Sequence, residues 1–483
     1  MEDQCRRFAV LGAALILFLL SGSCAMNPVS GGPELMLLSD SEEIQLGKQT
    51  DVQVRKQYGV YEDHKLNAYL NDMCQRLAKV SHRPNLPYKF EIVDASAVNA
   101  FAVPGGYVYF TRGILAHLNN EAELAGVMGH EIGHITARHS AQQYSRAQLA
   151  QFGLGVGGLF LPDLVSGVAQ LGVGMLFLRF SRDNERQADE LAVEYASRAG
   201  YDAKELAAFF ETLERMNPGS DRSGLPGWFS THPSPEDRVV AVRRGAKEWQ
   251  QKMGMRDPKV NQEAYLRHVD GLVYGDDPRQ GFVDEGVFYH PDMTFQFPVP
   301  ADWKVNNTHS QVQIMNENKD GGIIFSVATA ASPKDAAAKF VQANRASVLA
   351  SDSIMVSGFP AQRVVSDVRG QSGTIRVVSY FIQRDKSIFF FHGLSNPASF
   401  DKYMNTFERT MRGFKELSDP KRLNVKPDRI RLRTTKTAGT VESSLRSLGI
   451  PREELDDIAL LNGMELKDNL PANALVKVIE KGR

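Results

Sequence analysis

Cysteine is scarce in this sequence, and its placement excludes one large class of secreted proteins. The 483 residues contain three cysteines, Cys5, Cys24 and Cys74. The first lies inside an N-terminal segment typical of an export signal, and the second lies at the end of that segment. Cys74 is then left without a partner, so the sequence does not predict a disulfide-stabilised scaffold. Because Leu70 and Leu77 flank it, we expect Cys74 to be a buried thiol.

An excess of charge and long hydrophobic runs are also missing. The formal net charge is -1 and the pI is about 6.9, so we expect no nucleic-acid partner. The apolar run 8–20 is too short to span a bilayer comfortably, and the run 151–178 is split by Pro162-Asp163 into two shorter halves. We predict a helical hairpin over 151–178, which either lies at a bilayer surface, covers a cleft or is simply buried.

The N-terminal apolar run ends in a motif typical of lipoproteins. Two arginines precede the run, and Leu20-Ser21-Gly22-Ser23-Cys24 follows it, with small residues just before the cysteine. This motif resembles a bacterial lipobox, although serine stands where leucine is commonest. We predict that residues 1–23 are a signal peptide and that Cys24 becomes the lipidated first residue of the mature protein. A plain secretory signal and an uncleaved anchor are the alternatives.

The most informative stretch is His130-Glu131-x-x-His134. On a helix, residues four apart project from one face, so the two histidines can put two imidazole nitrogens on one metal ion. Glu131 would sit beside the metal, where it can take a proton from bound water without being a ligand. Asn120 is a plausible N-cap, and the pattern predicts a helix from about 121 to 139. The alternative is a solvated helix that carries two histidines by chance.

Two histidines leave a catalytic zinc one ligand short, because such sites use three protein ligands and an open water position. Glu185 and Asp189 are again four apart, at the predicted start of a second helix. We assign Glu185 as the third ligand. We expect Asp189 to accept a hydrogen bond from the free N–H of a ligand imidazole. Without the first motif, an ordinary charged helix start would be the better interpretation.

The order of these motifs resembles one family of metallopeptidases. His130-Glu131-x-x-His134 followed by Glu185-x-x-Ala188-Asp189 is similar to the gluzincin family of the CAAX prenyl proteases, HtpX and BepA. The run from Asn99 to Tyr109 and the triplet Thr231-His232-Pro233 also agree with that family. The resemblance covers roughly residues 40 to 245. It implies a zinc endopeptidase with one Zn²⁺ ion per chain.

The resemblance also places His232 and Arg238 near the metal. His232 is the candidate for stabilising the oxyanion that forms during hydrolysis, with Arg238 in support. In the relatives, the matching histidine has also been regarded as a group that can block the metal. The sequence does not choose between these roles. The loop 217–235 is rich in proline, glycine and serine, a composition that permits movement toward and away from the metal.

A predicted strand pair ahead of the metal-binding helix is the candidate substrate site. Residues 88–93 alternate like a strand, and residues 100–110 are broken by Pro104-Gly105-Gly106 into two strand segments joined by a turn. In metallopeptidases of this kind such a strand borders the cleft, and an exposed edge could bind an extended peptide by strand addition. We therefore assign substrate binding to three residues, Asn99, Phe101 and Ala102. Ordinary sheet structure is the alternative.

The whole chain is expected to be an α+β protein of several domains. A tether (24–38) leads into a mainly helical zincin protease domain with a small sheet, residues 39–275, with helices near 41–57, 63–80, 183–199 and 203–216. Residues 285–417 form a small α+β accessory domain that loosely resembles PsbP, with strands near 293–297, 323–327, 375–381 and 388–391. Two helices of this domain should begin at Ser332-Pro333 and Asn396-Pro397. A linker (420–427) then precedes a short C-terminal domain that resembles a degraded LysM module, residues 428–483.

These observations predict a zinc metalloendopeptidase of the bacterial cell envelope. Its partners would be protein and peptide substrates, namely misfolded or misassembled envelope proteins, together with a membrane reached through the lipid anchor. Contact with peptidoglycan through the LysM-like residues is possible, but the module usually has Asp between Gly439 and Thr440, and that Asp is missing. The alternative functions are a zinc-dependent chaperone or scaffold with latent proteolysis, and a wall-binding lipoprotein.

The lipobox makes a direct prediction about location. We expect the mature protein to begin at Cys24 and to face the periplasm. We expect it at the outer membrane, because Ala25 rather than Asp follows the cysteine. Labelled palmitate should enter the wild type and not the Cys24→Ala variant. Equal labelling of both proteins, or of neither, would contradict the lipoprotein prediction.

Overall fold

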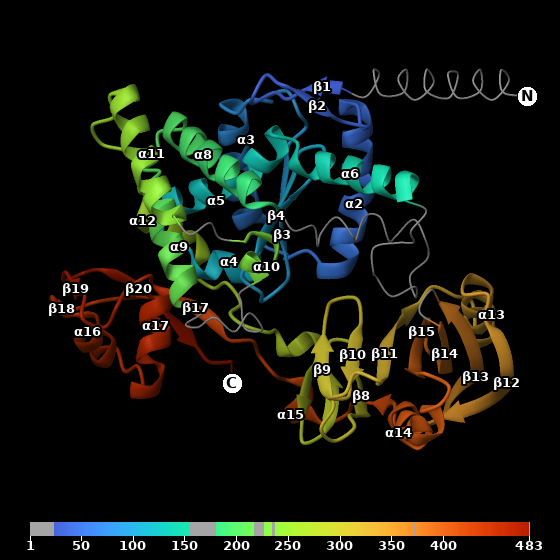
Figure 1. Ribbon diagram of the computed structural model, residues 1–483. Helices are drawn as coiled ribbons and strands as arrows, with labels where there is room; N and C mark the ends of the chain where they lie inside the picture. The colour runs from blue at the N-terminus through green and yellow to red at the C-terminus, as the bar shows by residue number, and fades with distance from the viewer. Residues whose placement is uncertain (1–23, 155–179, 217–226, 234–236, 371–372, 483) are drawn as a thin grey trace, which may run out of the picture.

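The computed structural model describes residues 24–154, 180–216, 227–233, 237–370 and 373–482 of the chain. It is a mixed α/β structure with a largely helical N-terminal region and several sheets (Figure 1). Over these ranges, no helix is both long enough and apolar enough to cross a membrane. The predicted signal peptide and most of the predicted hairpin over 151–178 lie outside the described residues.

Helices make up most of the N-terminal region, which we define as residues 24–275. The helices predicted near 41–57, 63–80, 183–199 and 203–216 are confirmed with ends within two residues. The helices of this region are α2 (Asp40–Tyr58), α3 (His64–Lys79), α4 (Arg112–His117), α5 (Glu121–Thr136), α6 (His139–Leu154), α8 (Arg182–Arg198), α9 (Glu205–Arg215), α10 (Gly227–Thr231), α11 (Arg238–Met253) and α12 (Gln262–Val269).

Helix α5 starts at the predicted residue, Glu121, and ends at Thr136, before the predicted end at about residue 139. The side chain of Asn120 caps it by accepting from the Glu123 N–H at 2.7 Å. The prediction that this helix reaches residue 139 is wrong, because the chain reverses at Arg138, which has a left-handed φ of 57°. The Arg138 side chain holds the reversal by donating to Glu43 Oε2 at 3.1 Å and to Leu38 O at 2.7 Å. No glycine or proline marks this turn in the sequence, so local composition could not reveal it.

Helices α5 and α8 pack unusually closely because glycines face alanines between them. A Cβ atom at Gly129 would lie 3.2 Å from Ala192 Cα, and one at Gly133 would lie 3.2 Å from Ala188 O. These separations are tighter than ordinary van der Waals contact, so only glycine fits without a shift of α8. All of α5 is buried. The tight contact is what brings the start of α8 beside the two motif histidines.

The small sheet of this region matches the predicted strand pair. Strands β3 (Lys89–Val93) and β5 (Tyr107–Thr111) run parallel, and β4 (Ala100–Val103) pairs antiparallel with β5, in the order β3-β5-β4. The turn between β4 and β5 has positive φ at Gly105 and Gly106, 81° and 98°. Glycine adopts these angles at little cost, which confirms the predicted turn. Strand β4 lies at one edge of this sheet.

The residues predicted to be a tether form a hairpin instead. Strands β1 (Cys24–Met26) and β2 (Pro33–Leu35) pair antiparallel, and the turn between them is closed by the Asn27 side chain. Gln142, on α6, donates to both Glu34 and Ala137 O, which attaches the hairpin to the start of α6. Residues 24–35 are therefore packed against the N-terminal region rather than extended away from it.

The accessory region, residues 276–417, contains two sheets and two helices. One sheet has the order β12-β13-β14-β15-β11-β10-β9 and the other the order β16-β8-β7-β6. The four strands predicted here fall within or beside β8, β11, β14 and β15. The element boundaries are β6 (Phe282–Asp284), β7 (Val287–His290), β8 (Phe295–Pro298), β9 (Lys304–Asn307), β10 (Val312–Met315), β11 (Gly321–Ala328), α13 (Pro333–Ala343), β12 (Ser347–Val356), β13 (Phe359–Gly370), β14 (Gly373–Arg384), β15 (Ser387–Ser395), α14 (Phe400–Arg412) and β16 (Lys415–Glu416), with a 3-10 turn at Pro278–Gln280.

The two predicted helix starts in this region have different outcomes. Ser332 caps α13 and Pro333 is its first residue, as predicted. The start at Asn396-Pro397 is wrong by three residues, because the Asn396 side chain accepts from the Ser399 N–H and closes a turn ahead of α14. An Asn before Pro suits a turn as well as a helix cap, so the sequence pattern was ambiguous there.

The C-terminal segment, residues 428–482, shares its core with the N-terminal region. Strands β17 (Arg429–Thr434) and β20 (Leu475–Glu480) pair antiparallel around α16 (Val441–Ser447) and α17 (Leu455–Leu461), with a 3-10 turn at Arg452–Glu454 and the short pair β18 (Gly439–Thr440) and β19 (Asn469–Leu470). Figure 1 shows this segment, in red, beside α9 and α12. Its buried apolar residues belong to the same cluster as those of α5 and α9: Ile430, Val441, Leu445, Leu455, Ile458, Ala459, Leu461, Leu470, Val476 and Val478. The expected independent domain is therefore continuous with the N-terminal core.

A buried lysine joins the two regions at the start of α5. Lys477 has no exposed surface, and its Nζ donates to Ala116 O at 2.7 Å and to Leu118 O at 2.8 Å. Its charge interacts with Glu123, in the first turn of α5. Burial lowers the pKa of Lys477 and raises the pKa of Glu123, because each charged form is desolvated there. The C-terminal segment thus contributes hydrogen bonds to the residues just ahead of α5 and a charge interaction to its first turn.

We predict that Lys477→Met destabilises the N-terminal region by about 2–4 kcal/mol. The variant keeps the length of the side chain and leaves two buried carbonyls and Glu123 without their partner. Thermal unfolding should show the loss, and amide hydrogen exchange should be faster in α5. Lys467→Met, at a side chain that is 81% exposed in the same segment, is the matched control and should change stability by less than about 0.5 kcal/mol. Equal melting temperatures for the two variants would contradict this account of Lys477.

Candidate metal centre

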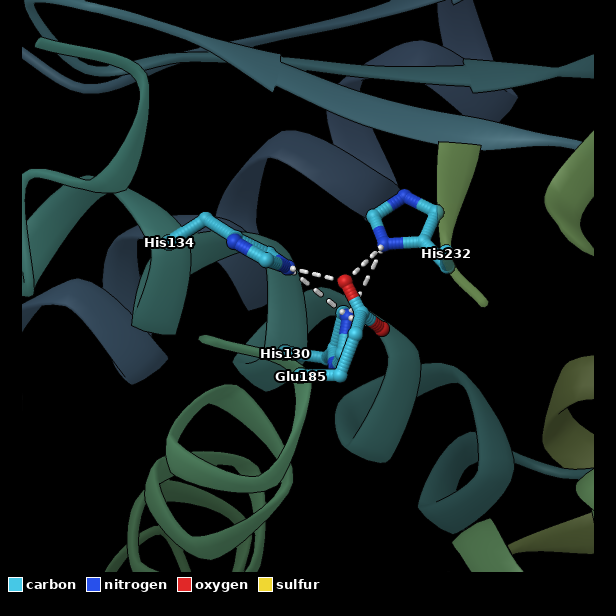
Figure 2. A group of neighbouring side chains, drawn as sticks. All are labelled: His130, His134, Glu185 and His232. Atoms are coloured by element: carbon cyan, nitrogen blue, oxygen red, sulfur yellow. Dashed lines mark hydrogen bonds and ion pairs between the residues drawn. The ribbon is translucent and has the colours of Figure 1, made fainter. Parts of the chain in front are cut away.

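Three elements bring four metal-binding side chains to one point. His130 and His134 project from α5, Glu185 from the first turn of α8, and His232 follows α10 directly. One ligand atom of each residue lies within 4.8 Å of the others. Figure 2 shows the three imidazoles and the carboxylate directed toward one another.

The distances between these atoms fit a tetrahedral metal ion. His130 Nε2 lies 3.0 Å from His134 Nε2 and 3.3 Å from His232 Nδ1. Glu185 Oε1 lies 3.1 Å from His232 Nδ1 and 3.5 Å from His134 Nε2, and Glu185 Oε2 lies 3.5 Å from His130 Nε2. Ligands held about 2.0–2.2 Å from a tetrahedral zinc are roughly 3.3–3.6 Å apart. The observed separations between the ligand atoms are close to these values.

Orphaned polar atoms provide a second test of the fit. Glu185 Oε2, Glu131 Oε1 and His232 Nε2 are buried and have no hydrogen-bond partner among the described residues. All the side chains of the group are at most 1% exposed. Burying unpaired carboxylate and imidazole atoms is costly, and a cation at the centre would offset that cost. Two or three imidazoles with one carboxylate form the donor set that zinc prefers. The residues present therefore fit a zinc ion.

His130 is held by a carboxylate and an arginine. Its Nδ1 lies 2.9 Å from Asp189 Oδ1, where the sequence places the acceptor for a ligand imidazole. Arg238 Nη2 donates to the same Asp189 oxygen at 2.8 Å and lies 3.5 Å from Glu185 Oε2. The guanidinium stacks on Phe210, with 3.8 Å between its carbon and the ring centre. Arg238 was predicted to support the oxyanion. In the structure it contacts the carboxylates that hold the histidines, so a positioning role fits it better.

His134 is held by residues that the sequence did not single out. Its Nδ1 lies 2.9 Å from Nδ1 of His139, the first residue of α6, and His139 Nε2 lies 2.9 Å from Gln187 Oε1. Burial lowers the pKa of His139 to about 4, so its ring is neutral near neutral pH. A histidine five residues after His134 would point elsewhere on a continuous helix. Only the turn at Arg138 brings it back, and no local pattern in the sequence marks that turn.

The pKa values of the two carboxylates of the site, Glu131 and Glu185, are shifted in opposite directions. Burial raises the pKa of Glu131 to about 7, an effect that the nearby His232 reduces. Burial also acts to raise the pKa of Glu185. The charge of His232 and the hydrogen bonds from His134 and His232 outweigh burial, and the pKa falls well below its usual value. Glu185 is thus held as an anion, and Glu131 can exchange a proton near neutral pH.

Of the three predicted substrate residues, Ala102 is the one that contacts this group. The backbone N–H of Ala102, on β4, hydrogen-bonds to the Glu131 carboxylate. The Phe101 side chain is 7% exposed and stacks on Tyr109, so it packs in the core and is not free to contact a substrate. The side-chain oxygen of Asn99 is buried without a partner among the described residues. Of these residues, the structure therefore connects the backbone of β4 to Glu131 and buries the Phe101 side chain.

Aromatic rings close the site on two sides. Trp228, on α10, stacks on His232 with ring centres 4.3 Å apart. Phe180, just ahead of α8, stacks on His134 with ring centres 4.0 Å apart. The backbone N–H of Trp228 also donates to Val98 O at 2.9 Å, which attaches α10 to the residues before β4. These rings therefore cover the imidazoles of His134 and His232.

Comparison with known proteins agrees with this geometry. The sequence profile of peptidase family M48 matches residues 64–246, the range that contains all four metal-binding side chains. Residues 64–246 are therefore the part of the chain that is similar to M48 peptidases. This match confirms the resemblance to the gluzincin metallopeptidases that the order of motifs predicts.

Curated relatives that match this part of the chain are beta-barrel assembly-enhancing proteases and a mitochondrial metalloendopeptidase. The chain is 32% identical to a putative beta-barrel assembly-enhancing protease of Vibrio cholerae over 206 residues, which cover 41% of this chain and 42% of that one. It is 30% identical to the beta-barrel assembly-enhancing protease of Escherichia coli K12 over 44% of this chain and 45% of that one. The mitochondrial metalloendopeptidase OMA1 of Arabidopsis thaliana is 32% identical over 39% and 38% of the two chains. The aligned part is less than half the length of each relative.

Solved structures resemble only a part of the chain. A cyanobacterial PsbP from Synechocystis is 10% identical, over 27% of this chain and 91% of that one, with a TM-score of 0.24. The yeast Ran-binding protein Mog1p is 9% identical, over 28% and 97% of the two chains, with a TM-score of 0.22. These scores are too low to carry an argument about fold or function.

The geometry predicts that mutations of the metal ligands and of the proposed base have different effects on zinc binding. His130→Ala, His134→Ala and Glu185→Ala should each abolish tight zinc binding, because each removes an atom that faces the metal. Glu131→Gln should keep zinc, because it replaces a group that handles protons and does not hold the ion. Metal content after dialysis and competition with a chelator measure both. Loss of zinc from Glu131→Gln, or full retention in Glu185→Ala, would contradict the assignment.

Proposed function

We propose that this chain is a zinc metalloendopeptidase of the bacterial cell envelope that hydrolyses peptide bonds in misfolded or misassembled envelope proteins. The observation that carries the proposal is the group of His130, His134, Glu185 and His232 at tetrahedral spacing, with Glu131 beside it. The M48 domain and the proteases among its relatives support the reaction class. The two relatives named for assembly of beta-barrel proteins support the choice of envelope substrates.

Each residue of the site then has a defined task. When bound, zinc would polarise the scissile carbonyl and lower the pKa of its water to about 7. His130, His134 and Glu185 would hold the ion. Glu131 takes the proton of the attacking water on its carboxylate and delivers it to the leaving amine, a role for which its raised pKa is suited. Asp189 and Arg238 keep His130 oriented.

The edge strand β4 is the proposed platform for the substrate. It pairs with β5 on one side, and among the described residues no strand pairs with its other side. An extended peptide could add to that edge through main-chain hydrogen bonds, which select for shape more than for sequence. The Ala102 N–H already contacts Glu131, so a peptide on this edge would lie beside the proposed base.

His232 is the proposed latch of the resting enzyme. Its Nδ1 occupies the fourth corner of the tetrahedron, the position that catalytic zinc sites keep for water. Substrate and water would therefore compete with this imidazole. The full burial of the site and the stacking of Trp228 on His232 support a closed resting state. The same closure favours latent proteolysis, which is the core of the alternative chaperone or scaffold function.

The remaining regions suggest how the protease is placed. We propose that Cys24 carries the lipid anchor at the outer membrane; because it begins the hairpin packed on α6, the M48 domain would be held near the bilayer. The strand, helix, helix, strand order of the C-terminal segment supports its LysM-like assignment, and peptidoglycan contact is its proposed role. The accessory region is proposed to have a binding or a spacer role.

Hydrolysis of casein by the purified protein tests the proposed function. The wild type should cleave casein, a chelator should stop cleavage, and zinc should restore it. Glu131→Gln is the matched control, because it should retain zinc and lose at least about 10²-fold in kcat. Equal cleavage by the wild type and Glu131→Gln would contradict the mechanism. Absence of cleavage by the wild type and by His232→Ala alike would favour the scaffold function.

His232→Ala distinguishes the latch from a stabiliser of the oxyanion. If His232 is the latch, its removal should raise basal kcat/KM by roughly ten-fold, which corresponds to about 1.4 kcal/mol of resting stabilisation. If His232 stabilises the oxyanion, kcat should fall by roughly 10²–10³-fold with little change in KM. Activity indistinguishable from the wild type would exclude both roles and leave His232 as a structural residue.

A further inference from the structure

His139 and Gln187 are buried or half-buried polar residues beside the metal centre that the proposed reaction does not use. His139 is 1% exposed and is not one of the metal-facing side chains. Its two ring nitrogens contact His134 Nδ1 and Gln187 Oε1, each at 2.9 Å. These contacts connect the first residue of α6 to α5 on one side and to α8 on the other.

The positions of the protons along these hydrogen bonds follow from the state of His134 Nε2. His134 Nε2 faces the other ligands, so it must be free of a proton to bind a metal ion. A neutral imidazole then carries its single proton on Nδ1. That N–H points at His139 Nδ1, which must accept. The proton of His139 is therefore on Nε2, which donates to Gln187 Oε1. Every donor along the path meets an acceptor.

The turn that brings His139 to His134 requires an unfavourable backbone conformation at Arg138. Arg138 occupies the left-handed region with φ 57°, a conformation that costs a non-glycine residue about 1 kcal/mol. Glu43, which is 1% exposed, pairs with Arg138 and with Arg83 and stabilises the turn. The turn places the rings of His134 and His139 with their centres 5.0 Å apart and their planes at 72°. That edge-on arrangement directs one ring nitrogen at the other.

The two motif histidines are thus held by different kinds of partner. The partner of His130 is the carboxylate of Asp189, backed by the charge of Arg238. The partner of His134 is the neutral ring of His139, backed by the amide of Gln187. A neutral acceptor orients the imidazole without adding a negative charge next to Glu185. Partners of this kind commonly change metal affinity by 10- to 100-fold when removed.

We propose that His139 and Gln187 form a hydrogen-bond relay that fixes the tautomer and orientation of His134, which makes His139 a positioning residue of the metal centre. The relay rests on the proposed function, because it gives His134 the task of binding zinc. The relay goes beyond that function by assigning a role to His139, the residue that follows the left-handed Arg138.

A pair of substitutions at His139 separates hydrogen bonding from packing. His139→Phe keeps a ring of similar shape and removes both nitrogens. His139→Asn loses the ring and can place its Oδ1 near the position of Nδ1, where it accepts from His134. The relay predicts a zinc dissociation constant about 10- to 100-fold higher for His139→Phe and within a few-fold of the wild type for His139→Asn. Gln187→Leu, which removes the last acceptor, should weaken zinc binding by less than ten-fold.

Chelator competition measures the zinc affinity, and the melting temperature of the zinc-free proteins reports separately on folding. Nitrogen NMR of the zinc-bound wild type provides a measurement that needs no variant, and it should find the proton of His134 on Nδ1 and that of His139 on Nε2. Tight binding by both the wild type and His139→Phe, or weaker binding by His139→Asn than by His139→Phe, would overturn the relay alone. Failure of the wild type to bind zinc would overturn the metal centre and the relay together.

Discussion

The close contact between α5 and α8 is the constraint on which the rest of the metal centre depends. Gly129 and Gly133 give the backbone of α8 room to approach, and that approach brings Glu185 within 3.5 Å of both motif histidines. A methyl group at either glycine would push α8 away by a few tenths of an ångström or more. Metal sites tolerate little such displacement, because ligand distances must agree with the ion to about 0.2 Å. The motif histidines provide nitrogen ligands, and the glycines allow α8 to bring Glu185 close to them.

Several buried polar groups around this contact have a partner that sets their state. Asp189 and Arg238 orient His130, and His139 orients His134, so the nitrogens that face the centre are left free of protons. Glu185 is held as an anion while Glu131, a few ångströms away, can change protonation near neutral pH. Two carboxylates in one site thereby acquire different roles through their surroundings. The C-terminal segment reaches the other end of α5 through Lys477, which links the furthest part of the sequence to the same helix.

The sequence predicts the parts of this arrangement that depend on local patterns. Helical spacing of His130 and His134, the Asn120 cap, and the glycine turn between β4 and β5 all follow from neighbours in the chain. The reversal at Arg138 depends on an ion pair with Glu43, some 95 residues away, and so no local pattern marks it. For the same reason the pattern could not show that His139 faces His134, that Arg238 contacts Asp189, or that residues 428–482 share the core of the N-terminal region.

X-ray absorption at the zinc edge tests the central claim, that four side chains from three elements hold one ion in a closed site. For the wild type at rest, the account predicts one zinc per chain with three imidazole nitrogens and one carboxylate oxygen at about 2.0–2.2 Å. The His232→Ala variant should show one imidazole fewer and a water oxygen in its place. Two imidazoles in the wild type, with a spectrum that His232→Ala leaves unchanged, would contradict the closed site.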